Sequence, residues 1–225
     1  MPGEAYLWHG DERLTLMAER AVWHDESGTL FVADVHLGKD ASFRRMGSAV
    51  PDGSDADTLA RLGALIDDLA PREVVILGDL WHHATGRTET ACDRFHAWRT
   101  VYPGRMTVVE GNHDRRSGRL RDEWNLELVQ NGAAWRGFTL WHEPERAESG
   151  SVGLAGHIHP GVRVRTSRTS SVRLPCFWKC GGILVLPAFG TFTGSATVTP
   201  GVSDSVFAIA DGAVVQIPTA LAGAV

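Results

Sequence analysis

Short apolar runs that end in a glycine and are followed by polar, ligand-type side chains recur along this chain. The clearest is the stretch 107–114, which reads Thr-Val-Val-Glu-Gly-Asn-His-Asp. The run 73–77 is of the same kind, and Gly78 and Asp79 follow it. Apolar runs of this length predict buried strands, and the glycine lets the backbone turn sharply as the strand leaves the sheet. Because ligands bind at the carboxyl ends of strands in open α/β sheets, the pattern predicts a site at that edge.

The first predicted strands, up to Asp34, are joined by turns and are expected to be antiparallel. Helices then separate the strands that end near residues 33, 77 and 109, which predicts βαβ units, and no helix separates the strands of the second half. Apolar residues recur at helical spacing over 54–70 and 91–101, and a proline follows each segment. Residues 38–53 are polar and rich in turn formers, so they predict a loop. The other predicted strands are 14–16, 20–23, 30–33, 138–141, 152–155, 182–186, 189–194, 205–210 and 213–217. We therefore expect an α/β (α+β) fold with a mixed sheet or two packed sheets, in a single domain over residues 1–225.

Composition argues against several classes of protein. The net charge of −5 and the pI near 6.0 are unlike those of a protein that coats duplex nucleic acid through a broad basic surface. No apolar run approaches the roughly 18 residues of a membrane span, and the N-terminus lacks a secretory signal, so a cytoplasmic protein is expected. Cys92, Cys176 and Cys180 are too few for a disulfide framework, and two thiolates alone make a poor zinc site.

Candidate metal ligands lie at the ends of five predicted strands. They are Asp34, His36, Asp79, Asn112, His142, His157 and His159. Residues two apart in an extended chain point to the same side, so Asp34 and His36 can bind one ion. His157 and His159 can do the same or reach two neighbouring ions. Mixed carboxylate, imidazole and amide ligands favour Mn²⁺, Fe or Zn²⁺ over Ca²⁺. The set exceeds the ligands of one tetrahedral zinc, so we expect two ions with Asp79 between them.

The order of these ligands resembles the signature of the calcineurin-like binuclear metallophosphoesterases. The matching segments, between about residues 30 and 160, are Asp34-x-His36, Gly78-Asp79, Gly111-Asn112-His113-Asp114, His142 and Gly156-His157-x-His159. Each segment is weak alone, but five in order at predicted strand ends are specific. The resemblance implies a four-layer αββα sandwich, in which two packed mixed β-sheets are flanked by helices.

The same resemblance implies a role for each residue. One ion would be held by Asp34, His36, Asp79 and His159, and the other by Asp79, Asn112, His142 and His157. His113 would not be a ligand but would protonate or stabilise the leaving oxygen. Asp114 would orient His113 by accepting its other N–H. Two ions roughly 3.5–4 Å apart would acidify a water for in-line attack on phosphorus.

Residues outside the ligand set resemble one particular group of proteins within this larger family. The segments concerned are 32–39, 43–44, 50–53, 78–82, 156–160, 173–177 and 186–194. Over about residues 30–195 the chain is similar to the ligase-associated DNA damage response endonucleases of the PdeM family. Val35 and Leu37 depart from it, because relatives are often more polar there or carry proline. The resemblance implies a manganese-dependent phosphodiesterase and endonuclease acting on single-stranded DNA, in bacterial repair with an ATP-dependent DNA ligase and a helicase-like protein.

Several assignments stay open at this level. Four arginines in loops near the predicted ligands can bind DNA phosphates or be ordinary exposed side chains: Arg44, Arg45, Arg115 and Arg116. His82 can contact substrate or simply begin the next turn. A small-molecule phosphatase or cyclic-nucleotide phosphodiesterase on the same scaffold is an alternative function, and a non-catalytic repair scaffold is another. The oligomeric state does not follow from the sequence.

Overall fold

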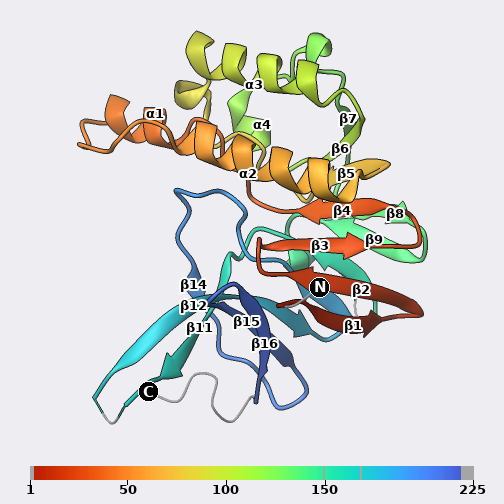
Figure 1. The fold of residues 1–225 in the computed structure, drawn as a ribbon. Helices are drawn as coiled ribbons and strands as arrows, with labels where there is room; N and C mark the ends of the chain where they lie inside the picture. The colour runs from red at the N-terminus through yellow and green to blue at the C-terminus, as the bar shows by residue number, and fades with distance from the viewer. Residues whose placement is uncertain (1–2, 149, 168, 219–225) are drawn as a thin grey trace.

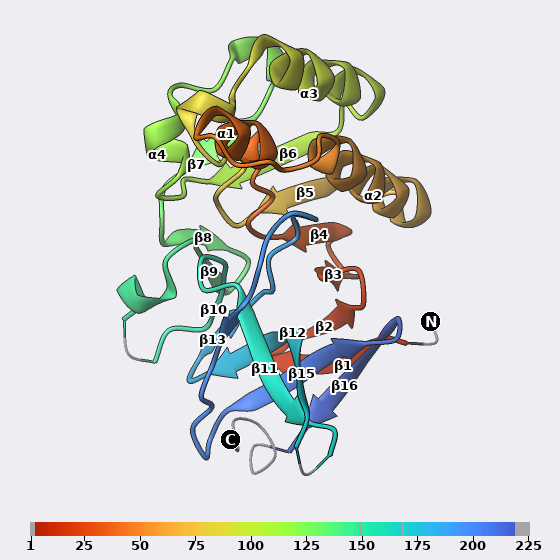
Figure 2. The same ribbon diagram turned by 90° about the vertical axis from the view of Figure 1, so that its left-hand side faces the viewer.

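The structure, a computed structural model, describes residues 3–148, 150–167 and 169–218. Two β-sheets pack face to face, and α-helices cover the outer face of the first sheet (Figures 1 and 2). This confirms the α/β fold class with two packed mixed sheets. No α-helix of the described residues covers the outer face of the second sheet. Within the same ranges, none of the helices is long and apolar enough to cross a bilayer.

The first sheet has seven strands in chain order. They are β1 (Ala5–His9), β2 (Glu12–Met17), β3 (Ala21–His24), β4 (Thr29–Val32), β5 (Glu73–Ile76), β6 (Arg105–Val109) and β7 (Glu127–Val129). β1 to β4 are antiparallel and joined by short turns, whereas β4 to β7 are parallel. Parallel neighbours need crossover connections, and the helices α2 (Ser54–Leu69) and α3 (Glu89–Val101) lie in two of them. The predicted βαβ units are thus confirmed.

The second sheet is built from the second half of the chain. Its strands are β8 (Ala133–Trp135), β9 (Phe138–Trp141), β10 (Gly153–Ala155), β11 (Pro160–Arg165), β12 (Ser171–Cys180), β13 (Ile183–Val185), β14 (Ala196–Thr197), β15 (Ser205–Ala210) and β16 (Ala213–Ile217). The order is β14-β11-β12-β13-β10-β9-β8, and β15 pairs with both β12 and β16. β9, β10 and β13 are parallel, so their carboxyl ends lie at the same edge.

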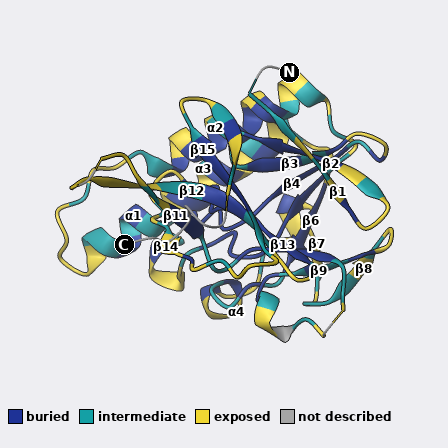
Figure 3. Cartoon of the chain, turned by 90° about the horizontal axis from the view of Figure 1, so that it is seen from below, coloured by how far each residue is buried: buried dark blue, intermediate teal, exposed yellow. Residues whose placement is uncertain are grey.

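Two apolar clusters hold the layers together. Leu59, Leu62 and Phe95 belong to a cluster in which α2 and α3 pack on the first sheet. Phe31 and Phe177 belong to a second cluster, which lies between the two sheets. Figure 3 shows that buried residues follow the strands through the centre of the molecule. Because both faces of the first sheet are covered, its parallel strands are apolar runs rather than alternating ones.

The predicted loop 38–53 is partly wrong, because it contains the helix α1 (Lys39–Arg45). This seven-residue helix begins after Gly38, whose φ is 73°, and it buries Asp40 and Ser42. A helix this short is not stable by itself in water, so tertiary contacts hold it and its sequence carries no periodic signal. Other short elements that were not predicted are the strands β1, β7, β8 and β14, the helix α4 (Asp114–Ser117) and the 3₁₀ turns η1 (Ala84–Gly86), η2 (Asp122–Trp124) and η3 (Pro144–Arg146).

The predicted strand 189–194 is also wrong. The backbone N–H of Phe189 donates to the carbonyl of Ala33 at 2.7 Å, and that of Gly190 donates to the carbonyl of Asp34 at 3.1 Å. These bonds attach the segment to the residues that follow β4, where it turns instead of extending a ladder. Phe189 is fully buried, so its apolar character reflects packing under the turn rather than a place in a sheet.

Candidate metal centre

The candidate ligands meet where the carboxyl ends of strands from both sheets come together. In the first sheet, Asp34 follows β4, Asp79 follows β5 and Asn112 follows β6. In the second sheet, His142 follows β9 and His157 follows β10. The backbone N–H of His157 donates to the carboxylate oxygens of Asp34, at 2.9 and 3.1 Å, and so joins the two sheets at this edge. Strand direction therefore gathers residues that are more than a hundred positions apart.

One group consists of Asp34, His36 and His159, whose ligand atoms lie within 4.8 Å of one another. Nε2 of His36 lies 3.2 Å from Nε2 of His159. The same atom of His159 lies 3.3 Å from Oδ1 of Asp34. Asp34 and His36 are buried, whereas the side chain of His159 is 21% exposed. His159 is thus the member of this group that solvent reaches.

A second group consists of Asp79, His142 and His157. Nε2 of His142 lies 3.3 Å from Oδ1 of Asp79 and 3.2 Å from Nδ1 of His157. Oδ1 of Asn112 lies 2.8 Å from the same Nε2. The other carboxylate oxygen of Asp79 lies 3.8 Å from Nε2 of His36 in the first group. Asp79 therefore turns one oxygen toward each group.

The atoms that face one another in this centre are mainly electron-pair donors. Nδ1 of His142 donates to the carbonyl of Leu77 at 3.0 Å, so Nε2 of the neutral ring carries a lone pair. That lone pair faces oxygens of Asp79 and Asn112, and such atoms repel unless a cation lies among them. Burial lowers the pKa of His142, but the hydrogen bond that a protonated Nε2 donates to Asp79 and the charge of Asp34 raise it to about 9. The same demand for positive charge suits divalent ions, and this mixed donor set fits transition metals.

The ligands sit on an unusual backbone. Five of the ten described non-glycine residues with positive φ are predicted ligands: Asp34, His36, Asp79, His157 and His159, with φ from 51° to 72°. Left-handed residues of this kind cost free energy and cluster at functional sites. The extended backbone assumed for the paired ligands is therefore wrong, although Asp34 and His36 do fall in one group. His157 and His159 belong to different groups, and a left-handed turn at each residue directs its side chain.

Two glycines are required by close approach. A Cβ at Gly78 would meet the imidazole of His142, and a Cβ at Gly111 would meet the carboxylate of Asp79. Gly78 also has a φ of 82°, which disfavours any side chain. Any larger residue at either position would displace a ligand, so these glycines allow the two groups to pack at their observed distances.

His113 lies beside both groups. Its Nδ1 donates to the backbone carbonyl of His82, because a carbonyl oxygen can only accept. Its Nε2 lies 4.0 Å from Oδ2 of Asp79, and the side chain is 31% exposed. The rings of His113 and His82 are stacked with their centroids 4.8 Å apart. A backbone carbonyl therefore sets the tautomer of His113 and directs Nε2 toward the centre.

The prediction that Asp114 orients His113 is wrong. The two carboxylate oxygens of Asp114 accept hydrogen bonds from the backbone N–H groups of Trp81 and Gly111, each at 3.1 Å. Asp114 is the first residue of α4 and is nearly buried, so its carboxylate binds amides of the adjoining strand ends instead. Burial and the charge of Asp79 raise the pKa of Asp114 to about 6. Asp114 supports the loops around the centre rather than the imidazole.

Residues 29–173, more than half of the chain, match the calcineurin-like phosphoesterase family. The chain belongs to this family. It is a metal-dependent hydrolase, and its family uses a binuclear centre of divalent metal ions. The match covers every strand end that carries a predicted ligand.

A solved relative extends the likeness over nearly the whole phosphoesterase. The crystal structure of Pseudomonas putida nuclease MPE is 32% identical, with a TM-score of 0.81, and the match covers 95% of this chain and 100% of that one. The phosphoesterase Yfce from E. coli is 18% identical, with a TM-score of 0.40 over 85% of this chain and 98% of that one. A search of curated protein sequences gave no match.

The predicted substrate residues are not equally placed in this phosphoesterase. His82 is within the centre, because its Nδ1 lies 3.4 Å from Nδ1 of His36. Arg44 donates to Asp52, and Arg115 donates to the buried carboxylate of Glu143 at 2.9 Å. The side chains of Arg45 and Arg116 are exposed. Of the four arginines, Arg44 and Arg115 are thus held by acids of the protein itself.

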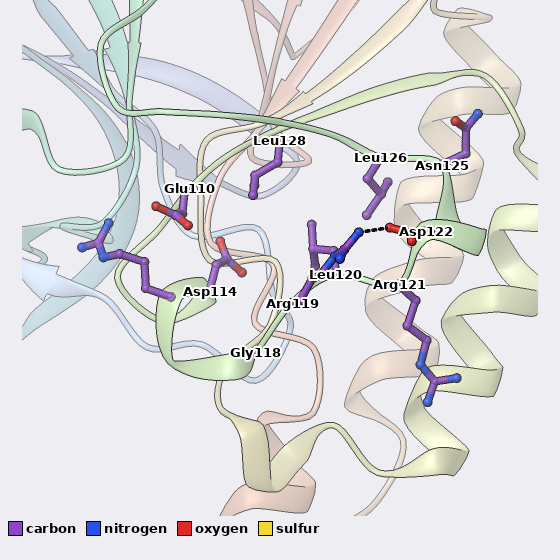
Figure 4. Close-up of a pocket in the computed structure, with 11 residues that line it drawn as sticks. Glu110, Asp114, Gly118, Arg119, Leu120, Arg121, Asp122, Asn125, Leu126 and Leu128 are labelled. Carbon is purple, nitrogen blue, oxygen red and sulfur yellow. Dashed lines mark hydrogen bonds and ion pairs between the residues drawn. The ribbon is translucent and has the colours of Figure 1, made fainter.

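A cavity of about 400 Å³ is lined by residues of α4, η2 and β7 and of the segments next to them (Figure 4). Asp114 and Arg115 line it, and Arg119 donates to Asp122, another lining residue, at 2.8 Å. None of the seven predicted ligands is among its lining residues. The volume of a cavity therefore does not identify the candidate metal centre of this phosphoesterase.

Sequence reasoning missed Lys39 as a residue near the centre. Burial lowers the pKa of Lys39, while the nearby charges of Asp34 and Asp79 act to raise it. Lys39 is the first residue of α1, and a helix there was not predicted, so only its position after the Asp34–Gly38 segment could have indicated it. None of the three cysteines belongs to a candidate metal-binding group of the described residues.

Proposed function

We propose that this phosphoesterase hydrolyses phosphodiester bonds of single-stranded DNA and uses two Mn²⁺ ions. The observation that carries the proposal is the pair of ligand groups joined by Asp79, with Nε2 of His113 beside them. One ion would be held by Asp34, His36, Asp79 and His159, and the other by Asp79, Asn112, His142 and His157. Similarity to a protein described as a nuclease supports a nucleic-acid substrate over other phosphoesters.

The chain's own groups position and protonate the reacting atoms. When bound, the two ions supply Lewis acidity toward the phosphate oxygens and the attacking water. The oxygen of water forms a bond to phosphorus, and the bond from phosphorus to the leaving oxygen breaks. The leaving oxygen takes the proton from Nε2 of His113, whose Nδ1–H stays on the carbonyl of His82. The proton lost by water passes to solvent, and solvent restores the proton on Nε2.

The setting we propose follows from the resemblance to the repair endonucleases described above. The enzyme acts in the cytoplasm as a single domain, in DNA repair alongside an ATP-dependent ligase and a helicase-like protein. Co-purification of the tagged chain with either partner after DNA damage tests this part, and recovery of neither would contradict it.

A metal-by-substrate matrix tests the chemistry. Purified protein is stripped of metal and supplied with Mn²⁺, Fe²⁺, Zn²⁺, Mg²⁺ or Ca²⁺. Each form is then given single-stranded DNA, duplex DNA, a p-nitrophenyl phosphodiester or a p-nitrophenyl phosphomonoester. We expect single-stranded DNA with Mn²⁺ to be cleaved fastest.

The matched control for this matrix is Asp79→Asn beside Glu73→Gln, because the two acids lie at opposite ends of β5. Asp79→Asn should lose about 10³-fold or more of the Mn²⁺-dependent activity, whereas Glu73→Gln should retain it. Hydrolysis of only the small esters would exclude the nuclease and support a small-molecule phosphodiesterase or phosphatase. Less than one bound metal ion per chain would support the non-catalytic scaffold.

A further inference from the structure

A row of aromatic rings leads from the candidate centre to the surface. It begins with His113, which stacks on His82 with a centroid distance of 4.8 Å. The ring of Phe43 stacks on the other ring of that pair, His82, at 6.0 Å and an interplanar angle of 23°. Phe192 then meets Phe43 edge to face at 5.9 Å. The proposed chemistry uses the imidazole of His113 and the backbone carbonyl of His82, but it gives no function to the two phenylalanines.

The outer end of this row is open to solvent. Phe192 is 38% exposed and is among the large apolar side chains that the described structure leaves at the surface. Phe43 is half-buried on α1 between Phe192 and His82. A phenylalanine held in this way keeps part of its ring in water at a cost in free energy, which a ligand with a flat apolar face would recover.

The segment that carries Phe192 is firmly attached. Thr191, the residue before Phe192, makes three hydrogen bonds to α2. Its backbone N–H donates to the hydroxyl of Thr58, and the two hydroxyl groups share a second bond. The hydroxyl of Thr191 also donates to the carbonyl of Ser54. Gly190 donates to the carbonyl of Asp34, itself a predicted ligand. In Figures 1 and 2 this blue segment rises from the second sheet toward α1 and α2. The exposed ring is therefore held in place beside the centre rather than left on a free loop.

Nucleobases are the flat ligands that a phosphodiesterase substrate of this kind carries next to its phosphates. Stacking of a base on an aromatic side chain is tolerant of sequence, because every base has a π face. In a duplex both faces of each base are covered by neighbours, so a base must be unstacked on one side to lie on a protein ring. An aromatic surface that adjoins the centre would thus favour unpaired strands over duplex.

We propose that Phe43 and Phe192 form a stacking platform for a nucleobase close to the scissile phosphate, and that this platform makes the enzyme prefer single-stranded substrate. The proposal rests on the proposed function, since it identifies how the same centre selects its substrate. The base stacks on the ring of Phe43, and the ring of Phe192, which the anchored segment holds in place, lies beside the stacked base. His82 continues the row inward to His113, so a base on the platform places its own phosphate near the ligands.

The decisive experiment removes the base and the ring in turn. A short single-stranded oligonucleotide contains one cleavable phosphodiester, and matched versions have an abasic sugar at each flanking position. For the wild type with Mn²⁺, we expect kcat/KM to fall about 10-fold when the stacked base is absent. Phe192→Leu and Phe43→Leu should each lose a similar factor on the intact strand, mainly through KM, but little further on the abasic strand. Phe192→Leu changes an exposed side chain, so its fold should persist, and its Tm checks this.

The control variant is Tyr6→Leu, which removes an exposed aromatic ring from β1, on the far side of the molecule from α1 (Figures 1 and 2). It should match the wild type on both strands. If Phe43→Leu and Phe192→Leu lowered kcat/KM by the same factor on the intact and abasic strands, the two rings would serve only in packing. That result would overturn the proposal. Equal kcat/KM of the wild type on both strands would overturn it as well.

A binding measurement separates this proposal from the proposed function. Metal-free protein is titrated into single-stranded DNA that carries 2-aminopurine, whose fluorescence falls when the base stacks on a ring. We expect quenching by the wild type and by Tyr6→Leu, and much weaker quenching by Phe192→Leu. If the wild type quenched the fluorescence but cleaved DNA with none of the metals, the result would contradict the proposed nuclease function and support the stacking platform. Identical quenching by the wild type and Phe192→Leu would remove the platform.

Discussion

The two ends of the parallel strands β4, β5 and β6 hold charged residues in opposite ways. At the amino ends, Arg105 lies 3.3 Å from Glu73 and 3.0 Å from Glu127, and two of these three side chains are more than half exposed. At the carboxyl ends, Asp34 and Asp79 are at most 1% exposed and face imidazoles. Cavities of about 420 and 400 Å³ lie near the amino and carboxyl ends respectively, so cavity volume does not distinguish them.

The two ends differ in whether their charged side chains are buried and in whether opposite charges pair there. At the amino ends, opposite charges pair in the presence of water, and exposed pairs of this type contribute little. At the carboxyl ends, buried carboxylates, ring nitrogens and an amide oxygen converge, and they share too few protons to satisfy one another. Buried charge of one sign needs a counter-charge, and divalent ions supply it. Residue type alone would have indicated a site at either end.

The largest effect should follow from removing the charge that joins the two ligand groups. Asp79→Asn keeps the size of the side chain but removes the negative charge that faces His142 and His36. We expect phosphodiesterase activity to fall on the order of 10³-fold or more, because metal ions supply several kcal/mol of transition-state stabilisation. Metal content by mass spectrometry should fall with it. Full activity with full metal content would show that the carboxyl ends do not differ from the amino ends as argued.

The next largest effect should come from the proton donor. His113→Ala should lower kcat by about 10²–10⁴-fold, the usual contribution of a general acid. Bound metal should stay at the wild-type level, because His113 donates to the carbonyl of His82 and is outside both ligand groups of the proposed centre. Metal analysis and kinetics on the same preparation check this. A parallel loss of metal and activity would make His113 a ligand instead.

A smaller effect should appear in the pH dependence of stability. Asp55 accepts two hydrogen bonds from the backbone N–H of Gly38, just beyond the carboxyl end of β4. Burial raises the pKa of Asp55 from 3.8 to about 6. A raised folded pKa means that the folded state holds the proton more tightly, so this stabilisation is present below pH 3.8 and is lost as pH rises through 6.

The matched variant for this effect is Asp55→Asn, which cannot titrate but keeps an acceptor oxygen for Gly38. Between pH 5 and pH 7, the stability of the wild type should fall by about 1 kcal/mol relative to the variant. Urea denaturation of the metal-free proteins at the two pH values measures the difference. If the unfolding free energies of the wild type and Asp55→Asn differed by the same amount at both pH values, the pKa of Asp55 would not be raised in the folded state.

The smallest effect should be found at the amino ends. Glu73→Gln removes one partner of Arg105 but keeps the oxygen that accepts from the hydroxyl of Thr107 at 2.7 Å. We expect unchanged kcat and KM and a Tm within a few degrees of the wild type, because partly exposed ion pairs contribute little. Calorimetry and the Mn²⁺ assay check both. A loss of activity near that of Asp79→Asn would remove the contrast between the two ends.

Much of the fold was predictable because its signals are local. The helices over 54–70 and 91–101 and five strands of the first sheet were predicted from apolar spacing, and α2, α3 and β2 to β6 confirm them, whereas β1 and β7 were not predicted. The segment 189–194 shows the limit. Its apolar residues predicted a strand, but hydrogen bonds to Ala33 and Asp34, more than 150 positions away, decide its conformation. Local patterns cannot report a partner at that separation.

The sequence by itself determined which side chains are available and that each follows a buried strand, because ligand type and apolar spacing are properties of neighbouring residues. Only the tertiary structure decided how they meet. It placed Asp79 between two groups, gave His113 the carbonyl of His82 instead of Asp114, and brought Phe43 and Phe192 together. These contacts depend on backbone atoms, left-handed turns and the closure of two sheets, and no residue pattern along the chain encodes them directly.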